Sequence, residues 1–358
     1  MKIYNRELEQ IENPELHAKV GSIIEKQIEF LVQTYGVDEK LLQDKVERLA
    51  IVERHAADAT YFVEYNGEKK ELPNSRSAAA FVTRKKQEYD GDKWSFESGI
   101  YMSDTNGEHK VIHELFHFLS QKQQMEFDEN GIGYTKSGIS MSGYDRQENL
   151  VDNSINAEGL NEGITELLAT KFDIGSNPEA YDFQTYIADI LISEHHNSLV
   201  KSYFSEDEKD FGKFLDEFDK QQNTISSKKL IEMSTDGQPI ADTKLLKGCL
   251  EYALSFCKDI DELKAERKRL LPIFKGMSEN INIEFDNKQL ELKEFFNDIL
   301  LKKKEEIENR VKSNDGKTIL ASAIEATKEV TKESQIEEQE KVISKIERNQ
   351  IEQIKGIE

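Results

Sequence analysis

The amino-acid sequence predicts a mostly helical α+β protein, in which a small antiparallel sheet is followed by a helical C-terminal lobe and long charged helices. Through most of the chain, apolar residues recur every three or four positions, which is typical of amphipathic helices. Across residues 58–103 this spacing gives way to short apolar and aromatic runs around Asn66-Gly67, a strong hairpin signal. Only 5 prolines and 19 glycines occur in 358 residues, so little interrupts the helices.

The spacing divides the chain into four segments. In chain order these are a helical lead-in, an α+β core, a helical lobe and a charged helical extension, at residues 1–57, 58–177, 178–286 and 287–358. The lead-in has two helices, broken near Tyr35-Gly36. In the core one helix begins near Asn106 and another near Ala157, with a glycine-rich hairpin or loop between them. Beyond Lys332 the isoleucine spacing predicts an amphipathic helix that packs on the protein itself or on a protein partner.

The chain is strongly acidic, with 48 Lys and Arg against 70 Asp and Glu and a formal net charge of -22. Such a surface repels phosphate backbones, which argues against a nucleic-acid partner. The sequence predicts neither a signal peptide nor a membrane span, because no apolar run approaches the roughly 18 residues that a span requires. Cys249 and Cys257 lack metal-ligand spacing and are expected to be packing residues in a reducing compartment. We therefore expect a cytoplasmic protein, and leaderless export is compatible with the same features.

The most informative segment is the H-E-x-x-H sequence at residues 113–117, which lies in an apolar run. Two histidines four positions apart lie on one face of a helix, so ring nitrogens of His113 and His117 can bind one zinc ion. Glu114 lies beside them, where it can act as general base on a zinc-bound water. Because the neighbouring residues are apolar, we expect a buried helix, in which histidines without partners would be costly.

A second helix offers the third protein ligand that catalytic zinc requires. Glu162 lies in the sequence Asn-Glu-Gly-Ile-Thr-Glu at residues 161–166, among apolar residues with helical spacing. Glu166, one turn later, can accept a hydrogen bond from the other ring nitrogen of a ligand histidine. Spacing alone does not select Glu162, because Glu158 and Glu166 share its helical face.

The two motifs together resemble those of the gluzincin metallopeptidases, the thermolysin-like clan, whose pattern is H-E-x-x-H followed by N-E-x-x-[ST]-[DE]. The resemblance covers about residues 95–200, and it departs from the commoner Asp in its last position. It implies that His113, His117 and Glu162 bind Zn²⁺. It also implies that Glu114 is the general base and that Glu166 orients a ligand histidine. It also implies a zincin-like core, with a substrate-binding edge strand and a helical lobe across a cleft.

Members of this clan stabilise the reaction's oxyanion with a His or a Tyr, and two parts of the sequence offer one. His195 and His196 lie in the helical lobe, although a histidine at a helix end also favours the negative end of the helix dipole. Tyr134 and Tyr144 lie in the glycine-rich stretch. We take His195 and Tyr144 as the catalytic candidates. His109 is expected in solvent, in the first turn of the H-E-x-x-H helix.

The sequence therefore predicts a zinc metallopeptidase acting on a peptide or protein, either broadly or as a narrow-specificity protease that cuts one target. Residues 94–102 are expected to form the last strand before the H-E-x-x-H helix. If this strand lies at an exposed edge of the sheet, it would bind an extended peptide as an added strand; the alternative is an ordinary interior strand. The rival from another class is a non-catalytic zinc-binding regulatory or interaction protein that uses residues 287–358 as its working surface. The two differ at the fourth zinc position, which is open in catalytic sites and closed by protein in structural ones.

Overall fold

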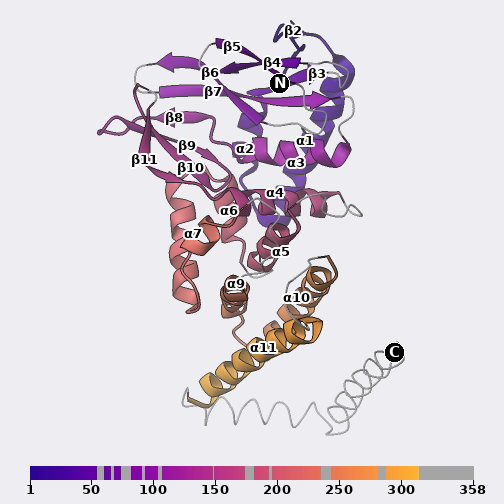
Figure 1. Ribbon diagram of the computed structural model, residues 1–358, viewed down its shortest axis with the longest axis vertical. Helices are drawn as coiled ribbons and strands as arrows, with labels where there is room; N and C mark the ends of the chain where they lie inside the picture. The colour runs from indigo at the N-terminus through magenta and orange to yellow at the C-terminus, as the bar shows by residue number, and fades with distance from the viewer. Residues whose placement is uncertain are drawn as a thin grey trace. The chain divides into compact units, whose positions relative to one another are not determined.

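A computed structural model describes residues 1–54, 60–65, 68–73, 82–90, 93–103, 107–147, 149–173, 181–192, 196–234, 243–280 and 288–313 (Figure 1). The chain divides into two units, Met1–Leu300 and Leu301–Glu358, and each is described by itself. Every strand named below belongs to the first unit.

The largest sheet gathers six strands from residues 2–126. They are β1 (Lys2–Tyr4), β2 (Gln10–Ile11), β3 (Leu49–Arg54), β6 (Val82–Asp90), β7 (Lys93–Ser103) and β8 (Gln124–Glu126). Their order is β2-β1-β3-β7-β6, with β8 paired to β7. The β1–β3 and β3–β7 pairs are parallel, so the sheet is mixed where an antiparallel one was expected. The reason is that the lead-in contributes β1 and β3, which reach their parallel partners through long crossovers.

The strand before the H-E-x-x-H helix, β7, is an interior strand. Along residues 98–103 it pairs with β3, and along residues 93–100 it pairs with β6. Its Trp94 and Ile100 side chains are buried. Residues 94, 95 and 98–100 are paired on both sides, with β6 on one side and β8 or β3 on the other, so the expectation of an exposed edge along residues 94–102 is wrong. At that end of the described order the edge strand is β6.

Two smaller sheets are antiparallel. β4 (Thr60–Tyr65) pairs with β5 (Glu68–Pro73), and the predicted Asn66-Gly67 turn between them lies outside the described residues. The glycine-rich stretch forms a three-stranded sheet from β9 (Ile132–Ser137), β10 (Ser140–Asp145) and β11 (Leu150–Ile155). Gly138 is required at the β9–β10 turn, because its φ is +59° and a Cβ atom would overlap the Asn161 side chain.

The two helices predicted for the lead-in are α1 (Pro14–Tyr35) and α2 (Glu39–Val46). The Asn13 side chain caps α1 by accepting a hydrogen bond from the Leu16 amide. Gly36 ends α1 in the left-handed conformation, with φ +64°, so the predicted break at Tyr35-Gly36 is confirmed. The segment 1–57 is not wholly helical, however, because it also contains β1 and β3.

The two motifs lie on α3 (Glu108–Ser120) and α4 (Glu158–Phe172), which pack against each other. Helix α1 supports α3: the Gln27 side chain donates a 2.9 Å hydrogen bond to the Ile112 carbonyl, and Phe30 packs edge-on against Phe116. Every residue of α3 from position 111 to 120 is buried. The prediction of a buried H-E-x-x-H helix is confirmed.

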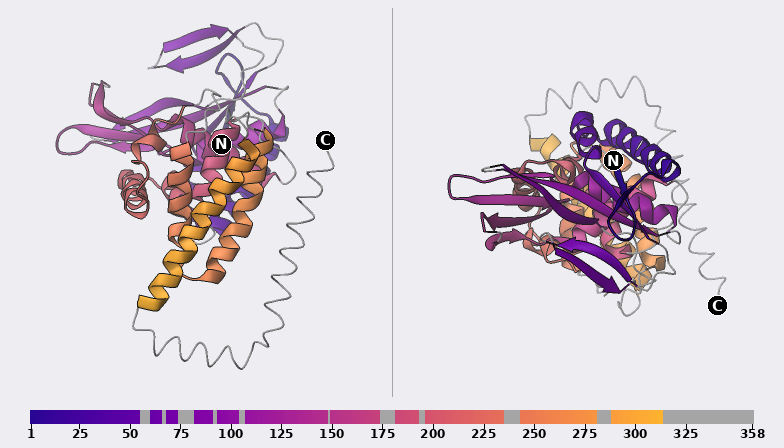
Figure 2. Two further views of the ribbon diagram at one scale, coloured as in Figure 1. Left: turned by 60° about the horizontal axis from the view of Figure 1, so that its bottom comes forward. Right: turned by 90° about the horizontal axis from the view of Figure 1, so that it is seen from above.

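The rest of the described chain is helical, as expected. The helices are α5 (Asp182–Leu191), α6 (Ser198–Phe204), α7 (Glu208–Gln221), α8 (Lys228–Ile231), α9 (Thr243–Ser255), α10 (Ile260–Asn280) and α11 (Lys288–Ser313). Helix α5 packs against α4, α9 and α10 (Figure 2). Gly163 lets α4 and α5 approach closely, since a Cβ atom there would overlap the Gln184 carbonyl. Cys249 and Cys257 are buried packing residues, as expected.

The mostly helical α+β architecture is confirmed. The two compact units divide after Leu300, and the expected segment boundaries at residues 57, 177 and 286 stay predictions. The isoleucine-spaced segment beyond Lys332 lies outside the described residues. Within the described part of the chain, each helix is too short or too polar to cross a bilayer.

Candidate metal centre

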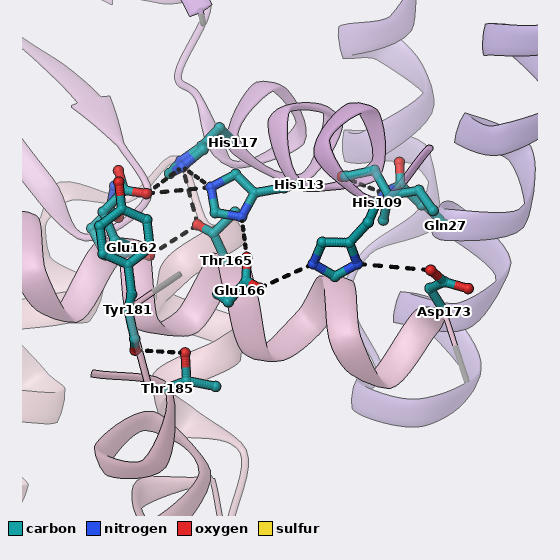
Figure 3. A network of polar contacts seen from close by, with 12 residues as sticks. Gln27, His109, His113, His117, Glu162, Thr165, Glu166, Asp173, Tyr181 and Thr185 are labelled. Carbon is teal, nitrogen blue, oxygen red and sulfur yellow. Dashed lines mark hydrogen bonds and ion pairs between the residues drawn. The ribbon is translucent and has the colours of Figure 1, made fainter. Parts of the chain in front are cut away.

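Three ligand atoms from α3 and α4 converge on one point (Figure 3). The Nε2 atoms of His113 and His117 are 3.1 Å apart. Oε2 of Glu162 lies 3.3 Å from Nε2 of His113 and 3.2 Å from Nε2 of His117. In a tetrahedral zinc site with bonds of about 2.0–2.1 Å, the ligand atoms lie about 3.3 Å from one another. The three atoms therefore have the separations that a zinc ion requires.

Glu166 holds His113 from the far side of its ring. Its Oε2 accepts a 2.8 Å hydrogen bond from Nδ1 of His113, and its Oε1 accepts one of 3.0 Å from Nε2 of His109. With the His113 proton on Nδ1, the lone pair of Nε2 faces the ligand cluster. All three side chains are buried, so these hydrogen bonds replace those that water would have made.

His109 belongs to this network, which corrects the expectation that it lies in solvent. Its side chain is 6% exposed, and its Nδ1 lies 3.7 Å from Oδ2 of Asp173. Imidazoles and carboxylates thus alternate from His113 through Glu166 and His109 to Asp173 (Figure 3). The four-residue spacing of His109 and His113 places both on one face of the helix. Because that face packs against α4, His109 is buried as well.

Thr165 fixes the ring of His117 in a similar way. Its Oγ1 lies 3.3 Å from Nδ1 of His117, and it donates a 2.9 Å hydrogen bond to the Asn161 carbonyl. The Tyr203 hydroxyl, from α6, also bonds to Oγ1 of Thr165. A hydroxyl has one proton and two lone pairs, so Thr165 accepts from both His117 and Tyr203. Nε2 of His117 is then left as a ligand atom, and Tyr203 is a supporting residue that the sequence analysis missed.

Burial and paired charges shift the pKa values around the cluster. Burial lowers the pKa of His113, but hydrogen bonds with Glu162 and Glu166 outweigh it and raise that pKa to about 10. Burial acts to raise the pKa of Glu162, yet the two histidines hold it well below its usual range. Burial raises the pKa of Glu114, against the opposing effect of His117 and His113. Without a metal ion, His113 therefore holds a second proton on Nε2 beside Glu162, and a bound zinc ion would displace that proton to reach the Nε2 lone pair. Glu114, with its raised pKa, is a nearby carboxylate able to take up a proton.

Tyr181 faces the cluster, although no sequence signal pointed to it. It precedes α5 with φ +58°, a left-handed conformation that costs a non-glycine residue roughly 1–2 kcal/mol. Its ring stacks on that of His113, with centroids 6.3 Å apart, and its side chain extends toward Glu162 (Figure 3). Burial first, and then the carboxylates of Glu162 and Glu114, raise the pKa of Tyr181 to about 12. The phenol therefore keeps its proton and can donate a hydrogen bond.

The structure does not bring Tyr144 into this cluster. On β10 it packs against the apolar group of Trp94, Met125 and Phe127. Tyr134 lies on the neighbouring strand β9, where its ring covers Gly143. In both cases the alternation of side chains across the three-stranded sheet sets where the ring points.

The remaining candidates divide between the helical lobe and the start of α4. His195 lies outside the described residues. His196 bonds to Glu217 at 2.8 Å and stacks on Phe256, so its ring is engaged within the helical lobe. Glu158 is exposed in the first turn of α4. Of the three glutamates on that face, the structure brings Glu162 to the two histidines.

Comparison of the chain with protein-family models, with curated proteins and with solved structures finds no match. The resemblance to the gluzincin metallopeptidases therefore rests on the two motifs.

Proposed function

We propose that this protein is a zinc-dependent peptidase that hydrolyses bonds in a peptide or protein substrate. The observation that carries the proposal is the convergence of His113 Nε2, His117 Nε2 and Glu162 Oε2, at mutual distances of 3.1 to 3.3 Å. The hydrogen bonds to Glu166 and Thr165 leave both Nε2 lone pairs facing that point. Two imidazoles and one carboxylate are a donor set that zinc accepts in catalytic sites.

The number of ligands favours a catalytic site over a structural one. Among the described residues, the group that could hold a metal consists of His113, His117 and Glu162. Structural zinc is normally enclosed by four protein ligands, whereas catalytic zinc has three and an open position. A water molecule or a substrate carbonyl would take that position.

The side chains beside the cluster divide the chemistry between them. A bound zinc ion supplies a water of lowered pKa and polarises the scissile carbonyl. Glu114, buried and with a raised pKa, accepts the proton of the attacking water and returns it to the leaving nitrogen. Tyr181 donates its phenolic hydrogen bond to the oxygen that becomes negative.

We place this activity in the cytoplasm. Cys249 and Cys257 are both buried and are not joined in a disulfide, which suits a reducing compartment. Burial raises the pKa of the Cys249 thiol, so it is an unreactive packing group there.

The test compares the wild-type protein with Glu114→Gln, which keeps the shape of the side chain and removes the base. Metal analysis should find one zinc ion per chain in both proteins. When each is added to a cell lysate, a proteome-wide survey of new N-termini should find products of the wild type that Glu114→Gln does not make. This survey also detects a protease with a single target, which generic peptide substrates would miss.

Two outcomes would contradict the proposal. Absence of stoichiometric zinc from the wild-type protein would remove the metal site altogether. Zinc in both proteins with the same N-termini would indicate a non-catalytic zinc-binding regulatory protein.

A further inference from the structure

A second feature, separate from the candidate metal centre at His113, His117 and Glu162, is a groove of about 690 Å³ between α1 and α2. Its floor is apolar: Gly21, Ile24, Ile28 and Val32 form a row along one face of α1, and Val46 adds to it from α2. None of the residues that line the groove belongs to the metal cluster. A ligand in this groove would therefore bind whether or not the protein is a peptidase.

The rim of the groove has a single sign of charge. Glu25 and Glu29 line it from α1, and Glu39 and Glu47 line it from α2 and the turn that follows. All four side chains are exposed, and no lysine or arginine is among the residues that line the groove. The only basic side chain there is that of His17. An apolar floor between two acidic rims is complementary to a ligand that is apolar along its middle and basic along both sides.

The shape indicates which kind of cationic ligand fits. Both walls are helices whose backbone groups are bonded internally, so the groove offers no sheet edge to an extended peptide. Ile24 and Ile28 are already buried, and the apolar side chains of the two helices that the groove leaves partly exposed are those of Val32 on α1 and Val46 on α2. A third helix laid along the groove would bury three or four apolar side chains and place its lysines and arginines beside the glutamates.

We propose that this groove is a docking site for a short, basic, amphipathic helix of a partner protein. The apolar stripe of that helix covers Gly21, Val32 and Val46, which are partly exposed, and its cationic flanks pair with the rim glutamates. Burial of the stripe supplies most of the affinity, and the charges select the partner and speed the encounter.

The probe for the test is a labelled helical peptide of about 16 residues, a little over four turns, with a leucine stripe flanked by lysines. Its binding to the full chain is followed by fluorescence anisotropy. Gly21→Leu is the blocking variant, because a Cβ atom at Gly21 has nothing within 4 Å and the added side chain fills the groove without a clash. We expect it to weaken binding by about tenfold or more, and leucine in place of glycine also favours the helix.

A matched control is available in Gly212 of α7, where an added Cβ atom likewise meets nothing within 4 Å. Gly212→Leu should bind the peptide as the wild type does. The double variant Glu25→Gln/Glu29→Gln should weaken binding by about threefold to tenfold and reduce its dependence on salt between about 0.05 and 0.15 M. A peptide with glutamates in place of the lysines should not bind.

Four results would overturn the proposal. Equal binding by Gly21→Leu and wild type would show that the peptide is held elsewhere by the acidic surface, and equal binding of the glutamate peptide would remove the charge argument. A dimer that Gly21→Leu converts to monomer would make a second copy of this chain the occupant. Failure of the full chain to bind, together with chemical cross-links from residues 314–358 to α1, would make the occupant the chain's own segment.

Discussion

Oε2 of Glu166 lies 2.8 Å from Nδ1 of His113, and this contact leaves Nε2 of the histidine facing His117 and Glu162. A ligand histidine whose second nitrogen is bonded to a carboxylate has a fixed tautomer and a more basic ligand atom.

Glu166→Gln should therefore weaken zinc binding by about 10- to 100-fold, because the charged acceptor is lost. The measurement is competition for zinc with a chromophoric chelator. Glu158→Gln, on the same helix but exposed, is the control and should bind zinc as the wild type does. Unchanged affinity in Glu166→Gln would argue that Glu166 has only a packing role.

Tyr181→Phe should lower kcat by about 100- to 1000-fold on any substrate found, because the hydrogen bond to the developing oxyanion is lost. Zinc affinity should not change, since the ring that stacks on His113 is kept. Tyr144→Phe is the matched control, because Tyr144 packs in a different cluster. If Tyr144→Phe and not Tyr181→Phe loses activity, the roles assigned to the two tyrosines must be exchanged.

Gly138→Ala should lower the free energy of unfolding by about 1 kcal/mol or more, because φ is +59° and the new methyl group would overlap Asn161. The Asn161 Oδ1 atom, which now accepts a 3.0 Å hydrogen bond from the Ile139 amide, would have to move. Urea denaturation measures the effect. Gly212→Ala is the control in open space within α7 and should be neutral or stabilising.

Because Lys136 is buried, the free energy of unfolding should depend on pH. Its Nζ donates to the carbonyls of Ser202, Tyr203 and Ser205 at the end of α6. Burial first, and then the charge of Lys45, lower the pKa of Lys136 from 10.5 to about 7. Between those two values the unfolded chain binds more protons than the folded one, so the contribution of Lys136 to the free energy of unfolding rises with pH.

The check compares wild type with Lys136→Met by urea denaturation at pH 7 and at about pH 10. The wild type should gain stability relative to the variant on going to the higher pH. A difference between the two proteins that is the same at both pH values would mean that Lys136 titrates in the folded protein as it does in the unfolded chain.

The sequence was most informative where function depends on spacing along a helix. His113 and His117 are four residues apart, and Glu162 and Glu166 are four residues apart, so helical geometry alone places each pair on one face. The break at Tyr35-Gly36 was predictable for a similar reason, because glycine takes up the left-handed conformation at little cost. Each of these signals is local.

The features that sequence did not predict depend on contacts between distant segments. Tyr181 reaches His113 from the position just before α5, through a backbone conformation that tyrosine rarely adopts. The burial of His109 depends on Glu166 and Asp173, which belong to another element. The interior place of β7 depends on β3, which precedes it by more than forty residues. Strand pairing at such a distance leaves no periodicity to read.

Helix α1 has two distinct faces. One face lines the groove between the glutamates. On an adjacent face, the Gln27 side chain donates a hydrogen bond to the Ile112 carbonyl in the middle of α3. The carbonyl that receives this bond immediately precedes His113. A tilt or slide of α1 would therefore act on α3 one residue before His113, a ligand of the proposed zinc site, with no intervening loop to absorb it.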